Sequence, residues 1–221
     1  MQSQNILKPI LLAIAVFILG GLFLFYLQWR NGNIISQPVG KIQNPKNQSE
    51  NSALNLILPL SDASRRITKK PFGIYISPNN SPVTPEKFTG YHTGVDFEIF
   101  LGEESRDIDV FAICNGKLLV KEFGHGYGGV MVQACDINSQ PVTVVYGHLK
   151  LTSVKVAVGG YINAGDVLGI LGRGYTIETD YERKHLHLGI HKGISIDIRG
   201  YVATESGLNN WINPLKVLEL N

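Results

Sequence analysis

The sequence predicts an all-β domain, an antiparallel sandwich or barrel-like fold, preceded by one N-terminal transmembrane helix. Three observations lead to this prediction. Residues 10–29 are an apolar run, a polar segment follows them, and the rest of the chain consists of short apolar or alternating runs broken by glycine. Turn signals about every 8 to 12 residues are typical of antiparallel all-β folds.

Residues 1–9 form a short tail, and the run after them, ILLAIAVFILGGLFLFYLQW, contains one polar residue, Gln28, and no charge. Twenty helical residues rise about 30 Å, which matches the hydrocarbon thickness of a bilayer. Tyr26 and Trp29 lie where aromatic side chains anchor a helix in the membrane interface. A buried core helix is the alternative, but a helix that is apolar on all sides has few such sites. We therefore expect residues 10–29 to span a membrane.

The apolar run is expected to remain attached as a signal-anchor. It is longer than a usual secretory apolar core, and neither a small-x-small cleavage site nor a lipid-acceptor cysteine follows it. Lys8 and the N-terminal amine on one side nearly balance Arg30 and Lys41 on the other. The positive-inside rule therefore leaves the orientation open.

Residues 30–53 are expected to form a flexible polar linker. Asn, Gln, Ser, Pro and Gly make up 15 of the 23 residues from Asn31 to Ala53. Such a composition buries too little apolar surface to offset its ordering entropy. Residues 54–221 remain, and a chain of that length is enough for one domain with a well-buried core.

Seven segments of this domain are predicted strands, because they are rich in Val, Ile, Leu and aromatic residues and are bounded by Gly, Asn or Asp. In chain order they are DVFAIC (109–114), KLLVKEF (117–123), GVMVQACDI (129–137), VTVVYGHL (142–149), SVKVAV (153–158), DVLGIL (166–171) and HLHLGIHKG (185–193). A short helix is predicted near ESGLNNWI (205–212), before Pro214.

Cys114 and Cys135 flank a predicted hairpin. An even pair in an exported domain suggests a disulfide, but spacing alone does not show that the two Cα atoms lie within about 7 Å. Two buried free thiols are the alternative. The formal net charge of +2 gives no support for a nucleic-acid partner.

The last predicted strand places His185, His187 and His191 on one face, because side chains alternate with a period of two. The aliphatic residues between them face the core. Same-face neighbours lie about 6.5 to 7 Å apart, close enough for two imidazoles to serve one site. The alternative is the solvated polar face of an ordinary amphipathic strand.

Two further segments could add to such a site. In YHTGVDFEIF, a fully extended strand would hold His92 and Asp96 about 13 Å apart, so Thr93 and Gly94 must bend the chain if both bind one ion. In VTVVYGHLK, alternation puts His148 on the face of the residues two, four and six positions before it, at the end of a strand. Three segments that each bring a histidine to a strand end match a metal site with one open coordination position. No H-E-x-x-H motif is present, which excludes a site of the zincin type.

The motifs HTGVD, YGHL and HLH, in this order, resemble the M23 family of zinc metallopeptidases, of the lysostaphin and LytM type. The surroundings agree: PFGIYISP precedes the first motif, FAICNGKL follows it, and then come GYGGVMV and VGGYINAGDVLGILG. The resemblance extends from about Lys70 to Pro214. It implies the fold of that family for nearly the whole domain.

The resemblance also implies roles for five residues. His92, Asp96 and His187 would be ligands of Zn²⁺, and His148 and His185 would be the catalytic pair that lines the cleft. It does not say which histidine of the pair takes the proton. His125 is expected to be a turn residue. His191 lies about 13 Å along the strand from His187 and is therefore not expected to bind the metal. Tyr91 and Tyr175 are either substrate contacts or surface aromatics.

The segment before HLH departs from the family pattern. M23 members often reach HLH through a short Gly/Ser/Thr segment and a proline. Here GRGYTIETDYERKHLHL is longer and charged, with Lys184 at the proline position. The substrate preference of the family is therefore not carried over.

The resemblance implies a membrane-anchored endopeptidase that hydrolyses peptide bonds in peptidoglycan cross-links or stem peptides with a zinc-activated water, outside the cytoplasmic membrane. A non-catalytic regulator or binder of cell-wall hydrolases, acting through an envelope protein, is the alternative, although such proteins are expected to lose motif residues and all five are present here. VAVGGYINAGDVLGIL also resembles the turn of lipoyl and biotinyl carrier domains, but no lysine occupies a tight hairpin tip in the expected way.

Overall fold

The computed structural model describes residues 56–220 of the 221-residue chain. The predicted transmembrane helix, residues 10–29, and the predicted linker, residues 30–53, lie outside the described residues and stay predictions. Between residues 56 and 220, no helix has both the length and the apolar composition that crossing a bilayer requires.

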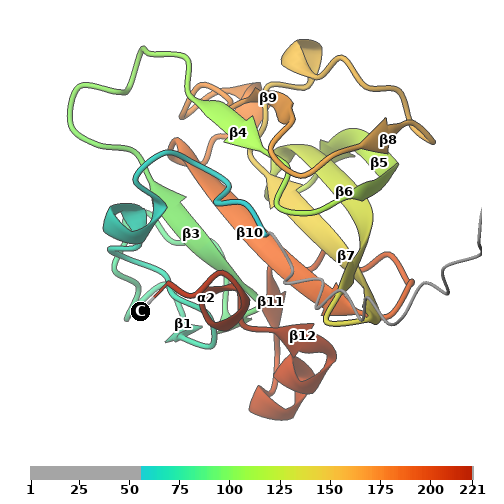
Figure 1. Ribbon diagram of the computed structural model, residues 1–221. Coiled ribbons are helices and arrows are strands. Elements are labelled where there is room, and N and C mark those ends of the chain that lie inside the picture. Colours follow the sequence, from blue (N-terminus) through green and yellow to red (C-terminus); the bar gives the residue numbers. More distant parts are fainter. Residues whose placement is uncertain (1–55, 221) are drawn as a thin grey trace, which may run out of the picture. The chain divides into compact units, whose positions relative to one another are not determined.

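The described residues are mostly antiparallel β-structure, as the sequence predicts (Figure 1). The main sheet has seven strands in the order β12-β10-β7-β6-β5-β8, with β3 also paired to β10. These strands are β3 (Gly94–Glu98), β5 (Gly116–Gly124), β6 (Gly128–Ile137), β7 (Gln140–Gly147), β8 (Tyr161–Ile162), β10 (His185–Lys192) and β12 (Trp211–Ile212).

Two small sheets and several short helices complete the described part. The small sheets contain β1 (Tyr75–Ile76), β2 (Gly90–His92) and β11 (Tyr201–Val202) in one, and β4 (Asp109–Phe111) and β9 (Val167–Ile170) in the other. The 3₁₀ helices are η1 (Ala63–Arg66), η2 (Leu151–Ser153), η3 (Ile177–Thr179) and η4 (Glu205–Asn210), and one α-helical turn, α2 (Pro214–Val217), lies near the C-terminus.

The main sheet has one core face and one face that carries polar residues. Leu186, Leu188 and Ile190 of β10 are fully buried in the main hydrophobic cluster. Burying one such side chain contributes roughly 1.5 to 3 kcal/mol. Because side chains alternate along a strand, His185 and His187 are directed to the opposite face. The alternation predicted for this strand is thus observed.

One local prediction is wrong. SVKVAV (153–158) forms no strand: Val154 N bonds to Leu151 O at the end of η2, and the place beside Leu118 of β5 is taken by Gly159 and Gly160. Val154 is buried, whereas Val158 is more than half exposed, so the apolar alternation in this segment does not mark one buried strand face.

The short helix predicted near 205–212 is present as a 3₁₀ helix. The 3₁₀ turn η4 ends at Asn210 and β12 follows it. Pro214 does not end a helix but begins α2, since a proline at the first helical position lacks only an N–H that would be unpaired there. The Asn213 side chain accepts a hydrogen bond from Leu215 N (3.0 Å) and caps this turn.

Cys114 and Cys135 form a disulfide, with their Cα atoms 6.1 Å apart. The sequence left this pairing open. Both cysteines belong to the main hydrophobic cluster, so the disulfide links the segment before β5 to β6 inside the core.

Candidate metal centre

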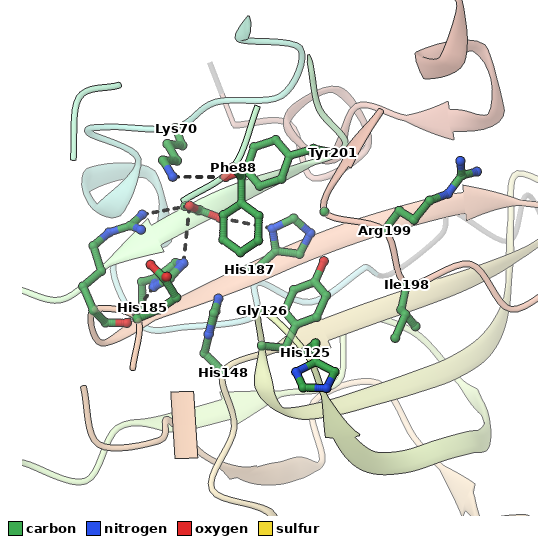
Figure 2. Close-up of a pocket in the computed structure, with 15 residues that line it drawn as sticks. Lys70, Phe88, His125, Gly126, His148, His185, His187, Ile198, Arg199 and Tyr201 are labelled. Carbon is green, nitrogen blue, oxygen red and sulfur yellow. Dashed lines mark hydrogen bonds and ion pairs between the residues drawn. The ribbon is translucent and has the colours of Figure 1, made fainter. Parts of the chain in front are cut away.

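The polar face of the main sheet forms the floor of a cleft with a volume of about 280 Å³ (Figure 2). His148, His185 and His187 point into this cleft, and Tyr201 and Phe88 lie above them. Asp96 also lines it. The cleft therefore collects residues from segments that are far apart in the sequence.

The antiparallel register of β3 and β10 places the acidic residues opposite the histidines. Asp96 pairs with His187 and Glu98 pairs with His185. Directly opposite residues of antiparallel strands have Cβ atoms about 4.5 to 5.5 Å apart. Asp96 and His187, separated by 91 positions, are therefore neighbours because of strand pairing, with His187 Nδ1 3.2 Å from Asp96 Oδ1.

His92 reaches the same point because the chain changes sheets at Thr93. His92 ends β2, which pairs with β11, and Gly94 begins β3, which pairs with β10. Thr93 is fixed at the bend by hydrogen bonds from its N to Gly200 O (3.0 Å) and from its Oγ1 to Arg199 O (2.6 Å). The bend required at Thr93 and Gly94 is present, and it brings His92 Nε2 to 3.2 Å from Asp96 Oδ1.

The donor atoms of His92, Asp96 and His187 form a nearly equilateral triangle. His92 Nε2 lies 3.0 Å from His187 Nδ1, and each lies 3.2 Å from Asp96 Oδ1. Donors about 2.0 to 2.2 Å from a tetrahedral zinc ion are roughly 3.3 to 3.6 Å apart, so the triangle is close to the size that zinc needs. Two imidazole nitrogens and a carboxylate oxygen are also the donor types that zinc takes. These residues therefore fit a metal ion.

Hydrogen bonding and burial shape the donor atoms of this site. His92 Nδ1 donates to Pro71 O (3.2 Å), which leaves the lone pair of Nε2 directed at the site. Burial lowers the pKa of His187 to about 4, although the hydrogen bond with Asp96 opposes this. Burial works to raise the pKa of Asp96, but the neighbouring His185 and His92 hold it well below its ordinary value.

His148 lies in the cleft by a route that alternation does not predict. The residues two, four and six positions before it face the core, and continued alternation would place His148 there too. Its φ of +64° is left-handed and turns the side chain to the polar face. The predicted position at the strand end is correct, and the predicted face is wrong.

His148 and His185 form a close pair beside the donor triangle. Their ring centroids lie 4.1 Å apart. Burial is the main cause that holds the pKa of His148 well below its ordinary value, and the nearby His185 is the second. His148 is therefore neutral at pH 7. His185 Nδ1 donates to Arg183 O (2.9 Å), and its Nε2 lies 3.4 Å from Asp96 Oδ2.

Tight packing surrounds His187. A Cβ added to Gly94 would lie 2.7 Å from His187 Cε1. Gly147, opposite His187 on β7, leaves room for the ring of Tyr127, whose centroid is 5.2 Å from that of His187. The imidazole is therefore held between two strands and an aromatic ring.

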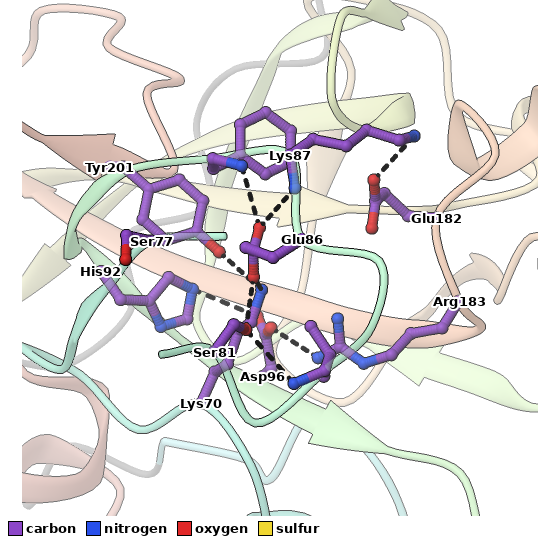
Figure 3. Close-up of polar contacts among 12 residues, drawn as sticks. Lys70, Ser77, Ser81, Glu86, Lys87, His92, Asp96, Glu182, Arg183 and Tyr201 are labelled. Atoms are coloured by element: carbon purple, nitrogen blue, oxygen red, sulfur yellow. Dashed lines mark hydrogen bonds and ion pairs between the residues drawn. The ribbon is translucent and has the colours of Figure 1, made fainter. Parts of the chain in front are cut away.

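A buried ion pair lies at the other wall of the cleft (Figure 3). Lys70 Nζ lies 2.6 Å from Glu86 Oε2 and 3.0 Å from the hydroxyl of Tyr201, and both charged side chains are almost fully buried. The ring of Phe88 stacks on Tyr201, with centroids 5.3 Å apart. Lys87, next along the chain, lies 2.9 Å from Glu182.

These neighbours could hardly be predicted from local sequence patterns. Lys70, Glu86 and Tyr201 are separated by up to 131 positions, and only folding brings them together. Glu98 was the easiest of these neighbours to predict, because it lies two residues after Asp96 and therefore on the same face of the strand. Arg183 lies in the charged segment before HLH, but nothing local in that segment indicates its contact with Asp96.

The other candidate residues take varied positions. His125 lies in the turn between β5 and β6, as expected, and its side chain also lines the rim of the cleft (Figure 2). His191 packs on Trp211 with ring centroids 4.9 Å apart, outside the cleft lining. Tyr91 packs on Tyr75, and Tyr175 is exposed. None of these four residues belongs to the donor triangle.

Comparisons with known proteins agree with this geometry. Residues 90–198 match Peptidase family M23. Endolysin 2638A of Staphylococcus phage 2638A is 26% identical over 134 residues, which are 55% of this chain and 26% of the endolysin. The chain therefore spans about a quarter of that relative's length.

Two solved structures are similar to the chain. LytU is 26% identical, with a TM-score of 0.46 over 70% of this chain and 84% of that chain. The catalytic domain of lysostaphin from Staphylococcus simulans is 22% identical, with a TM-score of 0.47 over 73% of this chain and 98% of that chain.

Proposed function

Because residues 90–198 form a peptidase family M23 domain, we propose that the chain is a zinc metalloendopeptidase that hydrolyses peptide bonds in the cross-links or stem peptides of peptidoglycan. The observation that carries the proposal is the convergence of His92, Asp96 and His187 beside a second histidine pair. A regulator would not need either set, and both are complete.

In this proposal His92, Asp96 and His187 hold the zinc ion. Two neutral imidazoles and one carboxylate leave a divalent ion with a net positive charge. A bound zinc ion supplies Lewis acidity, which polarises a scissile carbonyl and lowers the pKa of water.

The contacts of the histidine pair support a division of roles. His185 donates its Nδ1 proton to Arg183 O, so Nε2, which lies 3.4 Å from Asp96 Oδ2, is the ring nitrogen that would accept a proton from water in this proposal. His148 is neutral at pH 7 and keeps one N–H. It can donate a hydrogen bond to the oxyanion that develops at the carbonyl.

We further propose that residues 10–29 anchor the domain in the cytoplasmic membrane, with residues 30–53 as a tether and the domain on the outer side. The apolar run and the polar linker composition support the anchor. The Cys114–Cys135 disulfide supports the outer placement, since disulfides persist in oxidising compartments. The tether would keep the cleft within a few nanometres of the bilayer.

Zinc content and muropeptide release test the catalytic proposal. The purified full-length protein should contain one zinc ion per chain and release new peptide termini from isolated sacculi. Sequencing the new termini of defined muropeptides would identify the bond. A protein that held zinc and released no peptide would contradict the proposal and favour the regulator.

Two substitutions separate metal binding from proton transfer. His187→Ala should lose zinc, because it removes one corner of the donor triangle. His185→Ala should retain zinc and lose turnover by about 10² to 10⁴-fold, the usual contribution of a general base. Release of zinc from His185→Ala would show that the division of roles is wrong.

A further inference from the structure

The charged segment before HLH places one side chain directly against a proposed zinc ligand. Arg183 lies two residues before the start of β10, and its guanidinium reaches over the end of β3 (Figure 3). Its Nη2 donates to Asp96 Oδ2 at 2.8 Å. The side chain is only 11% exposed, so solvent weakens this contact little.

The two oxygens of Asp96 have different partners. Oδ1 faces His92 Nε2 and His187 Nδ1, each at 3.2 Å. Oδ2 is directed away from them, toward Arg183 and His185. Rotation of the carboxylate would exchange the two oxygens, and the hydrogen bond from Arg183 opposes that rotation.

Glu98 holds the guanidinium in this position. It pairs with His185 across the strands and accepts from Arg183 Nε with both carboxylate oxygens, each at 3.0 Å. Its charge also offsets that of the guanidinium. Asp96 therefore keeps its own negative charge for a cation, although a positive group lies beside it.

The backbone of Arg183 is fixed as well. Its carbonyl accepts the hydrogen bond from His185 Nδ1 (2.9 Å). On the outer side, Lys184 donates to the carbonyls of Glu103 (3.1 Å) and Arg106. Lys184, which occupies the position where the family often has proline, thus ties this end of the segment to a second loop.

We propose that Arg183, held by Glu98, is a positioning residue that fixes the Asp96 carboxylate with Oδ1 toward the metal and, through its carbonyl, fixes the ring of His185. This inference rests on the proposed function, since it assumes that Asp96 is a zinc ligand. It gives the charged segment a role in assembling the site.

Zinc affinity of the full-length protein in detergent, measured by competition with a chromophoric chelator, tests the proposal. Arg183→Met should weaken zinc binding about 10- to 100-fold, the usual effect of losing a group that orients a ligand. Arg183→Lys keeps the positive charge but loses the planar guanidinium that hydrogen-bonds both Asp96 and Glu98. Its zinc affinity should lie between that of Arg183→Met and that of the wild type. The absorption spectrum of the cobalt-substituted protein should change in both variants.

Two controls separate positioning from charge and from folding. Arg199 also lines the cleft, but its side chain donates hydrogen bonds to the Asp197 carboxylate and not to Asp96. Arg199→Met should therefore leave zinc affinity unchanged. In the double variant Arg183→Met/Glu98→Gln no unpaired carboxylate remains beside Asp96. Zinc binding should still be at least about tenfold weaker than in the wild type, with the melting temperature of the zinc-free protein close to that of the wild type.

Two results would overturn the inference. If the double variant bound zinc within twofold of the wild type, Arg183 would serve only to balance charge. If the wild-type protein bound no zinc, the proposed function would fail, and the positioning role with it.

Discussion

The packing around His187 connects the sequence of β3 to the chemistry of the site. Gly94 lies opposite Gly189 on β10, and the imidazole of His187 occupies the space where a side chain at residue 94 would lie. The added Cβ would also contact the carbonyl oxygen of Leu188. Glycine at this position therefore leaves the space that the His187 imidazole occupies.

Gly94→Ala should displace His187 and weaken zinc binding at least about tenfold. The overpacked side chain should also lower the free energy of unfolding by about 1 to 3 kcal/mol. Chelator competition and thermal unfolding measure the two effects. Gly116→Ala is the matched control, because its Cβ would meet Ala134 O away from the site. It should lose stability and keep zinc affinity, and equal zinc affinity in both variants would contradict this account.

At the residue scale, the sequence identified the five histidine and aspartate positions of the site but few of their neighbours. HTGVD, YGHL and HLH are short motifs that mark His92, His148 and His187 locally. The position of Arg183 against Asp96 depends on the register of two strands that lie about 90 residues apart, and no local pattern contains that register. The left-handed turn at His148 also depends on the surrounding fold.

At the scale of elements, the segment from Ser77 to Phe88 brings the ring of Phe88 to the lining of the cleft. The buried ion pair between Glu86 and Lys70 attaches this segment to the rest of the domain. Burial works to raise the pKa of Glu86, but the hydrogen bonds from Lys70 and Ser81 lower it below its ordinary value. A carboxylate with a lowered pKa stabilises the fold above about pH 4.5, and this contribution is lost as the pH falls through the folded-state pKa.

Glu86→Gln should destabilise the domain by about 3 to 5 kcal/mol at pH 7, because Lys70 is left buried without its partner. The difference from the wild type should begin to shrink as the pH falls below about 4.5, where the carboxylate of the unfolded chain takes up a proton, and should disappear below the lower pKa of Glu86 in the folded state. Thermal unfolding at a series of pH values measures this difference. The double variant Lys70→Met/Glu86→Gln should recover most of the lost stability, and a gap independent of pH would disprove the role of the ion pair.

The Cys114–Cys135 disulfide is a second link between elements, joining the segment before β5 to β6. It closes a loop with a sequence separation of 21 around β5 and part of β6. Replacing both cysteines with serine should lower the free energy of unfolding by about 3 kcal/mol. For a domain of this size the melting temperature should fall by roughly 6 to 12 °C. An unchanged melting temperature in the absence of reductant would show that the disulfide contributes no stability.

Strand prediction succeeded where an apolar run also had a pairing partner. Of the seven predicted strands, SVKVAV (153–158) alone has no strand within it, because Gly159, Gly160 and β8 occupy the adjacent edge of β5. Competition for an edge involves the whole sheet. The composition of one segment therefore cannot decide it.

At the scale of the whole molecule, membrane attachment and peptide cleavage are proposed for separate parts of the chain and can be tested separately. The full-length chain should sediment with membranes and resist extraction by carbonate, because residues 10–29 are long enough to span the bilayer. A chain of residues 54–221 should be soluble and should cleave soluble muropeptides at a rate similar to that of the full-length protein. Extraction of the full-length chain by carbonate would contradict the anchor.

The pairing of Asp96 with His187 across two strands has one more consequence. Slippage of β3 by a single position would turn Asp96 into the hydrophobic interior and present Val95 or Phe97 to the imidazoles. A misaligned sheet would thus lose both its apolar packing and its proposed zinc ligand at once. The β3–β10 hydrogen bonds that stabilise the sheet are therefore the same ones on which the proposed activity depends.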